Sequence, residues 1–357
     1  IETTGLDNIL GVASSVSAVN RAGWTATTID AYWPLFETLS SSLGTMLQGQ
    51  LDDLTDDDIS QMSEMLPDDM PIDMASLMEG LSGLMGPMML VTLAGSTVGQ
   101  LGRRAFGSYE LPIPRAGGGV LVVATEVDEF ARDWSLDPDD VRLWVVLREI
   151  SLHAVLTLPH VATRLTDLLS RHARSFRADP EAMAEQLGDI DPYDPSSMER
   201  LSDVFSDPNV ILRAIRSPEQ DELVPYIDAL VSTVCAYSDW VVDSIGSRFV
   251  SSHSMVTEAL RRRRLEADLS TQFVERLFGL ELSADKLDSA TRFIEGIVER
   301  GGTDALADLW SEESHLPTPP EVEAPGLWLA RVAPDGVQDL PELDEPADVP
   351  DFWDLDS

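Results

Sequence analysis

Apolar residues recur at helical spacing along most of this chain, and the pattern predicts a mainly helical protein. Near the start, Trp24, Trp33, Phe36 and Leu39 belong to one such series, with Pro34 as a candidate break point. The same spacing predicts further amphipathic helices at 160–175, 179–188, 196–206, 222–250, 255–265, 271–279 and 284–300.

The clearest helix start in the sequence lies at Asp137-Pro138-Asp139-Asp140. Asp137 suits an N-cap, Pro138 suits the first turn, and the acids that follow lie at the positive end of the helix dipole. Apolar residues at helical spacing continue to about Leu158, where the next residue is a proline. We therefore expect a helix over about 138–158.

Two apolar segments depart from the amphipathic pattern. Residues 80–102 carry no charge and are long enough to cross a membrane, but glycines and a proline interrupt them. We expect a buried helix there and no membrane association. Val120–Ala124 has the composition of a short β-strand after a glycine-rich loop. The expected fold class is therefore mainly α with a small β element.

Three regions are expected along the chain: an N-terminal helical region at 1–110, a core at 111–332 and an acidic tail at 333–357. Helical periodicity ends at about Pro317, and the acidic composition of the tail predicts disorder. Residues 51–80 are acidic and rich in methionine. The stretch 62–89 therefore offers either an adaptable binding face or, as we favour, one face of a core helix.

The overall charge limits the partners that the chain is expected to bind. The formal net charge of −39 argues against nucleic acid and anionic lipid, and leaves a protein or peptide as the expected partner. The single cysteine, Cys235, excludes an internal disulfide and suits the reducing cytoplasm. Because no basic segment precedes an apolar one at Ile1, we expect no secretory signal. The sequence leaves the oligomeric state open.

The segment Leu147–His153 matches part of a zinc-peptidase motif. In His-Glu-x-x-His, two histidines one helical turn apart bind zinc, and the glutamate activates the zinc-bound water. Here the glutamate is present as Glu149, but Arg148 and Leu152 stand at the two ligand positions. Neither side chain can bind zinc.

Several further phrases, in a fixed order, extend the comparison beyond this segment. They are Asn20–Trp24, Asp139–Trp144, His153–Leu156, Glu258–Arg264, Phe273–Leu277 and Ala324–Ala330. With these phrases the chain resembles the zincin-like metallopeptidases of actinobacteria that are often labelled hydrolases, whose relatives include proteins associated with deazaflavin-cofactor biosynthesis. The resemblance spans about residues 15–332 and implies a zincin-metallopeptidase-like helical architecture around a zinc ion.

The resemblance also implies which positions should bind the metal. The family helix reads Leu-His-Glu-x-x-His-His-Ala, so His153 matches the extra histidine that follows the motif. A later family helix reads Glu-Gly-Tyr-x-Asp-His, where Cys235 and Trp240 replace the glutamate and the histidine. Tyr237 and Asp239 keep the family residues. The expected ligand positions are thus degenerate at Arg148, Leu152, Cys235 and Trp240, and Glu149 is a vestigial general base.

Two functions remain after this comparison. The first is a non-catalytic binding or scaffold protein that holds no metal, with Arg148 paired to Asp239 or Asp243. His153, Tyr237, Asp239 and Asp243 would then be cleft residues. The alternative is an active metal-dependent peptide hydrolase whose displaced ligands come from Glu149, His153, His160 and Asp239.

The basic run Arg261–Arg264 has two interpretations. It could bind an anion or a phosphate group, but four successive helical positions face in different directions. We therefore expect these arginines to pair with nearby acids such as Glu258, Glu266 and Asp268. His172, His253 and His315 are expected at the surface or at helix caps.

Overall fold

A computed structural model describes residues 16–52, 92, 94–117, 119–177, 216–265 and 269–334. The predicted helices at 179–188 and 196–206, most of the methionine-rich stretch 62–89 and nearly all of the acidic tail lie outside these residues, as does much of 80–102. The division into three regions stays a prediction.

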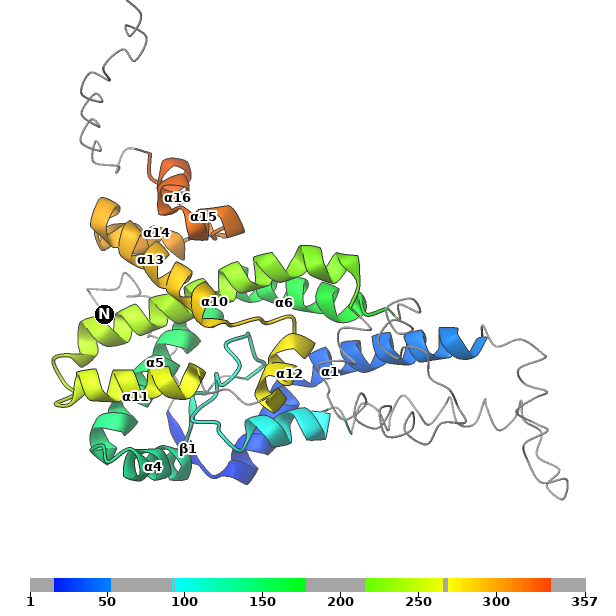
Figure 1. Ribbon diagram of the computed structural model, residues 1–357, viewed down its shortest axis with the longest axis horizontal. Helices are drawn as coiled ribbons and strands as arrows, with labels where there is room; N and C mark the ends of the chain where they lie inside the picture. Colours follow the sequence, from blue (N-terminus) through cyan, green and yellow to red (C-terminus); the bar gives the residue numbers. More distant parts are fainter. Residues whose placement is uncertain are drawn as a thin grey trace, which may run out of the picture.

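Helices make up most of the described chain, as the hydrophobic pattern predicts (Figure 1). Two short strands, at 17–19 and 121–123, pair in parallel and form the small β element. In chain order the elements are β1 (Ser17–Val19), α1 (Arg21–Asp52), β2 (Leu121–Val123), α4 (Ala124–Asp133), α5 (Pro138–Leu156), α6 (Pro159–Arg174), α10 (Pro218–Gly246), α11 (His253–Leu265), α12 (Leu269–Leu277), α13 (Ala284–Gly301), α14 (Asp304–Leu309), the 3-10 helix η2 (Glu313–His315), α15 (Pro319–Glu323) and α16 (Pro325–Val332).

Helix α5 begins as the sequence predicts. The Asp137 carboxylate accepts hydrogen bonds from the backbone N–H groups of Asp139 and Asp140, and Pro138 lies in the first turn. The helix ends at Leu156, directly before α6, and it packs against α10. Its burial against α10 fixes the direction in which the degenerate motif residues point.

The N-terminal helix corrects one expectation, because α1 runs through Pro34 without a break. A proline removes one backbone hydrogen bond, yet Tyr32 and Phe36 on either side of it are buried in the core. The Thr38 hydroxyl also donates a hydrogen bond to the Pro34 carbonyl. Burial on both sides therefore outweighs the local cost of the proline.

The structure also corrects the expectation for the segment after Pro317. Helical periodicity was expected to end there, but α15 and α16 follow. A capping box at Thr318 starts α15, with the Glu321 side chain accepting from the Thr318 N–H, and prolines occupy the first turns of both helices. These helices are shorter than the window over which periodicity can be read. Trp328 anchors α16 in the core against Phe293 of α13.

The hydrophobic core follows α10, which contacts α5, α6, α13 and α15 (Figure 1). Its side chains come mainly from α1, α5, α6, α10 and α13. A smaller cluster joins α4, α5 and the start of α11. In the part of the chain that the structure describes, no helix is long and apolar enough to cross a membrane. Residues 94–101 are helical, with Ala94, Val98 and Leu101 buried.

Candidate functional site

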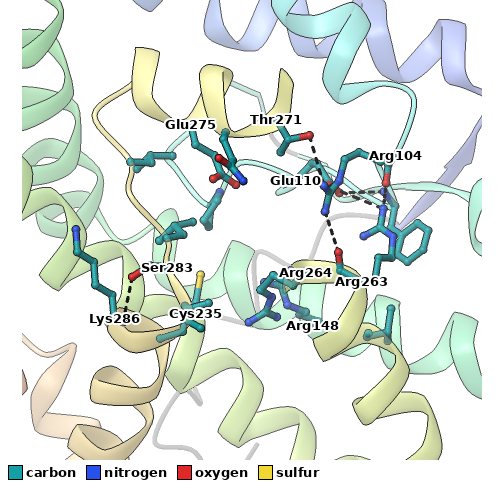
Figure 2. Close-up of a pocket in the computed structure, with 18 of the residues that line it drawn as sticks. Arg104, Glu110, Arg148, Cys235, Arg263, Arg264, Thr271, Glu275, Ser283 and Lys286 are labelled. Atoms are coloured by element: carbon teal, nitrogen blue, oxygen red, sulfur yellow. Dashed lines mark hydrogen bonds and ion pairs between the residues drawn. The ribbon is translucent and has the colours of Figure 1, made fainter. Parts of the chain in front are cut away.

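A cavity of about 500 Å³ lies where α5, α10, α11 and α12 meet. Segments 104–112 and 280–287 complete its lining. Its lining includes Arg148 and Glu149 from α5, Cys235 from α10 and Arg263 and Arg264 from α11. Figure 2 shows Arg148 and Arg264 beside each other on one side, with Glu275 of α12 across the cavity. Three of the sequence-predicted site residues, Arg148, Glu149 and Cys235, therefore share one cavity.

Asp239 of α10 joins two arginines at the cavity wall. The Arg148 Nε atom lies 3.3 Å from Asp239 Oδ1, which confirms the predicted ion pair. Arg264 donates to both carboxylate oxygens of Asp239, with Nη1–Oδ2 and Nη2–Oδ1 distances of 2.9 and 3.3 Å. Burial alone would raise the pKa of Asp239, but Arg264 and Arg148 outweigh it and hold that pKa below its usual value.

A second pair of arginines shares Glu110. Arg104 Nε lies 3.1 Å from Glu110 Oε1, and Arg263 Nη2 lies 3.9 Å from the same oxygen. Arg263 also donates to the Arg104 carbonyl and stacks over the Phe106 ring, 3.7 Å from its centroid. Burial and the neighbouring arginines lower the pKa of Arg263, against the opposing effect of Glu110. We call Arg104, Arg148, Arg263 and Arg264 the arginine wall.

The expectation that the 261–264 arginines pair with nearby acids is partly right, and two of the acids that it names, Glu266 and Asp268, lie outside the described residues. Arg262 is exposed and pairs with Glu258, 2.7 Å away on the same helix. Arg263 and Arg264 instead turn inward and meet acids from other elements, Glu110 and Asp239. Four successive positions do face in different directions, and two of those directions lead into the cavity.

Glu149 is buried, with only 3% of its surface exposed. Its Oε2 atom accepts a hydrogen bond of 2.9 Å from the Tyr109 N–H, and its side chain packs on Gly107 so closely that a Cβ atom there would lie 2.3 Å from Glu149 Cδ. Burial raises the pKa of Glu149 to about 7, although Arg148 lowers it. No ion pair to Glu149 is present among the described residues.

His153 lies on a different face of α5 from Arg148. Its Nδ1 atom is 2.8 Å from the Tyr109 hydroxyl, and its Nε2 atom is buried without a hydrogen-bond partner in the described chain. Burial, and then Arg115, lower its pKa. Leu152 is fully buried in the hydrophobic core. Neither residue lines the cavity.

The remaining sequence-predicted residues on α10 lie away from the cavity as well. Tyr237 is buried and stacks on Trp240, which packs against the core. Asp243 pairs with His253, whose Nε2 atom is 2.9 Å away, and so takes no part in the pairing of Arg148. His172, expected at the surface or at a helix cap, lies in the last turn of α6 but is buried beside Gly279, so the expected surface position is wrong.

Comparison with known proteins places this architecture in a family. Residues 2–329 match the model of the zincin-like metallopeptidases, and the chain therefore belongs to that family. A solved structure from Chloroflexus aurantiacus, described as a putative hydrolase with a novel fold, is similar with a TM-score of 0.48 and 20% identity. The similarity covers 92% of this chain and 97% of that one. No curated protein matches.

The family name implies a zinc ion, and the side chains at the expected position can be compared with what zinc requires. Zinc takes imidazole, thiolate and carboxylate ligands. Arg148 and Leu152 offer none of these, and the Asp239 carboxylate already accepts from two arginines. Among the described residues, no three histidine, cysteine, aspartate or glutamate side chains form a group that could hold a metal. The residues present therefore do not fit a zinc ion here.

Sequence reasoning missed most of the arginine wall. Arg104 lies 44 positions before Arg148 in the chain, in a segment without regular structure, and no local pattern connects it to α11. The sequence did offer one indication for Arg264. It predicted an arginine-rich helix at 255–265, and Asp239 of the preceding helix was expected to remain at the site without its metal. Connecting Arg264 to Asp239 required knowing that α11 folds back along α10.

Proposed function

We propose that this chain is a zincin-like family member that has lost its zinc ligands and acts as a non-catalytic binding or scaffold protein. The observation that carries the proposal is the ion pair of Arg148 with Asp239. In the family, by the resemblance of the motif helix, a histidine ligand would stand in place of Arg148. A guanidinium stays positively charged at any physiological pH and repels a divalent cation.

Glu149 by itself gives little support to a hydrolytic role. Without a metal, a water molecule keeps a pKa near 15.7 instead of about 7, and a carboxylate alone generates little hydroxide from it. The Glu149 carboxylate is also held by the Tyr109 N–H and packed against Gly107. We therefore interpret Glu149 as a structural remnant of the general base.

The cavity supports a binding role. Its volume of about 500 Å³ lies within the range of small-ligand sites and suits a short peptide. Its lining residues come from α5, α10, α11, α12 and the start of α13, so that a ligand there would touch several helices together. We propose a peptide or a protein segment as the partner, in the cytoplasm, where a protein with one free buried cysteine is stable.

The alternative, a hydrolase with displaced metal ligands, has less support. Its ligands would come from Glu149, His153, His160 and Asp239, yet Glu149 and His153 are each engaged by Tyr109. Asp239 is engaged by two arginines. Glu149, His153 and Asp239 could bind a metal ion together only if these hydrogen bonds and ion pairs were broken.

Elemental mass spectrometry of protein purified without chelator or affinity tag tests the proposal. We expect far less than one zinc per chain, unchanged in Glu149→Gln. A variant with Arg148→His, Leu152→His and Trp240→His restores three histidines of the family motifs and is the positive control for metal uptake. One tightly bound zinc per wild-type chain would overturn the proposal.

A further inference from the structure

The charge of the cavity contrasts with the charge of the whole chain. The protein carries a formal net charge of −39, yet four arginines meet at one wall of the cavity. Among the described residues, two carboxylates form ion pairs with them: Asp239 with Arg148 and Arg264, and Glu110 with Arg104 and Arg263. The arginine wall therefore has more positive than paired negative charges.

Two further acids line the cavity without pairing with this wall. Glu149 and Glu275 have no ion pair among the described residues, and burial raises the pKa of each to about 7. Near neutral pH a substantial fraction of each is therefore uncharged. Lys286 and Glu281, farther along the lining, pair with each other at 3.1 Å and form a separate group. Glu149 and Glu275 can therefore balance the excess charge at the wall only in part near neutral pH.

Arg263 shows the imbalance most clearly. Its guanidinium is mostly buried, and its nearest carboxylate oxygen is 3.9 Å away. Three other arginines lie close enough to lower its pKa. Buried charges in proteins are normally paired, because taking a charge out of water is costly. Stacking on Phe106 offsets part of this cost, and an anion in the cavity would offset more.

Arg148 has unused hydrogen-bond donors beside the cavity. It donates to Asp239 through Nε, and its two Nη atoms form no hydrogen bond within the described residues. Arg264, by contrast, uses both of its Nη atoms on Asp239. The planar fork of a guanidinium matches two oxygens of one carboxylate or phosphate group. Figure 2 shows Arg148 at the edge of the open space, next to Arg264.

We propose that the arginine wall binds the oxyanion group of a small ligand, a carboxylate or a phosphate, with Arg148 and Arg263 as its anchors. The Asp239 carboxylate shows how such a group is held, because Arg264 donates to both of its oxygens. Leu280, Leu282 and Leu287 line another part of the cavity and suit an apolar body attached to the anion. The proposal rests on the binding role proposed above for the same cavity and names its ligand class.

Isothermal titration calorimetry tests the site with two probes, inorganic phosphate and the acetylated dipeptide acetyl-Leu-Glu. The amidated form, acetyl-Leu-Gln-amide, has no negative charge and is the control ligand. We expect saturable binding of at least one anionic probe, no binding of the control, and weaker binding as salt is added. Binding of the dipeptide alone assigns a carboxylate, and binding of phosphate alone assigns a phosphate.

Variants identify the residues that hold the anion. Arg148→Met and Arg263→Met should each weaken binding at least about tenfold, because each removes charge-assisted hydrogen bonds. Arg262→Met is the matched control, since Arg262 neighbours Arg263 but is exposed and pairs with Glu258. Arg148→Lys keeps the positive charge but loses the planar guanidinium, so it should retain part of the affinity. This variant keeps the test possible even if a methionine variant does not fold.

The outcomes separate this proposal from the proposed function. If neither probe binds, or if Arg148→Lys and Arg263→Met bind as the wild type does, the oxyanion site is wrong even in a zinc-free protein. If a purified chain holds zinc and its anion binding disappears when the zinc is removed, the loss of zinc ligands is wrong, because the metal and not the arginine wall holds the anion.

Discussion

Helix α10 carries two ion-pair clusters, three turns apart, that differ in how their charges are balanced. At one, Asp228 is buried and accepts from Lys286 and from the Glu281 N–H, while Glu281 pairs with Lys286 and Arg216. At the other, Asp239 is the one carboxylate of the described chain within ion-pair distance of Arg148 and Arg264, and 34% of its side chain is exposed. The first cluster has as many buried or half-buried acids as bases, with the exposed Asp221 as a further partner of Arg216, and the second has one acid and two bases.

The pKa shifts of the two aspartates follow the same difference. Burial raises the pKa of Asp228 even though Lys286 opposes it, whereas the two arginines lower the pKa of Asp239 in spite of its burial. The balanced cluster ties α10 to the start of α13 and, although Lys286 and Glu281 also line the cavity, it leaves no excess positive charge for an anion. An unbalanced cluster beside a cavity attracts an anion. On this one helix, the Asp228 cluster therefore stabilises the fold, whereas the Asp239 cluster suits the binding of an anion.

The largest effect should come from breaking the balanced cluster. Asp228→Ala removes the acceptor of both the Lys286 ammonium and the Glu281 N–H, and should lower the free energy of unfolding by about 3 kcal/mol. Urea denaturation measures this. Asp221→Ala, on the exposed side of the same helix, removes a surface ion pair with Arg216 and should cost less than about 1 kcal/mol. Equal costs for the two variants would contradict the comparison.

A second test asks whether an ionised Glu149 balances the positive charge of Arg148 and Arg264 that Asp239 alone leaves unbalanced. The folded-state pKa of Glu149 is raised to about 7, above the value of about 4.3 for an unfolded chain, so its contribution to stability falls as pH rises through this interval. Glu149→Gln abolishes that fall and keeps the acceptor for the Tyr109 N–H. One pKa unit corresponds to about 1.4 kcal/mol, so relative to wild type the variant should gain about 3 kcal/mol between pH 4 and pH 8.

Urea denaturation of both proteins at a series of pH values gives this difference. Glu275→Gln is a useful companion, because the pKa of Glu275 is raised to about 7 as well. If Glu149→Gln instead becomes less stable than wild type as pH rises, Glu149 is a counter-charge of the arginine wall. The wall would then be balanced, and the contrast between the two clusters on α10 would disappear.

The smallest effect should come from Asp239→Asn. It leaves Arg148 and Arg264 unneutralised, but both are partly exposed, so we expect a loss of only about 1 kcal/mol. Added phosphate should restore the melting temperature of this variant more than an uncharged osmolyte does, because the anion takes the place of the carboxylate. Asp228→Ala should not be restored in this way, and restoration of both variants would show a nonspecific effect of phosphate.

Local chemistry made part of this structure predictable. The N-cap and proline at Asp137-Pro138 set the start of α5, and the hydrophobic pattern predicted α6, α10, α11, α12 and α13 close to their observed bounds. Strand β2 followed from five apolar residues after a glycine-rich loop. The pairing of Arg148 with Asp239 could be predicted because the resemblance placed both residues at one site.

Contacts between distant segments were not predictable in the same way. Strand β1 is too short to be recognised by alternation, and only its pairing with β2 defines it. The inward direction of Arg263 depends on the ring of Phe106 and the carbonyl of Arg104, neither of which is near it in the sequence. A helical wheel gives the direction of a side chain, but the surrounding structure decides whether that direction leads to solvent or to a cavity.

The parallel pairing of β1 with β2 has a consequence for the order of folding. Ser17 lies opposite Leu121, so the first described strand cannot form its hydrogen bonds until more than a hundred further residues have been synthesised. Closing such a long loop is entropically costly and slow compared with helix formation. During synthesis, β1 therefore stays unpaired until β2 has left the ribosome, and in that interval chaperones and proteases can reach it.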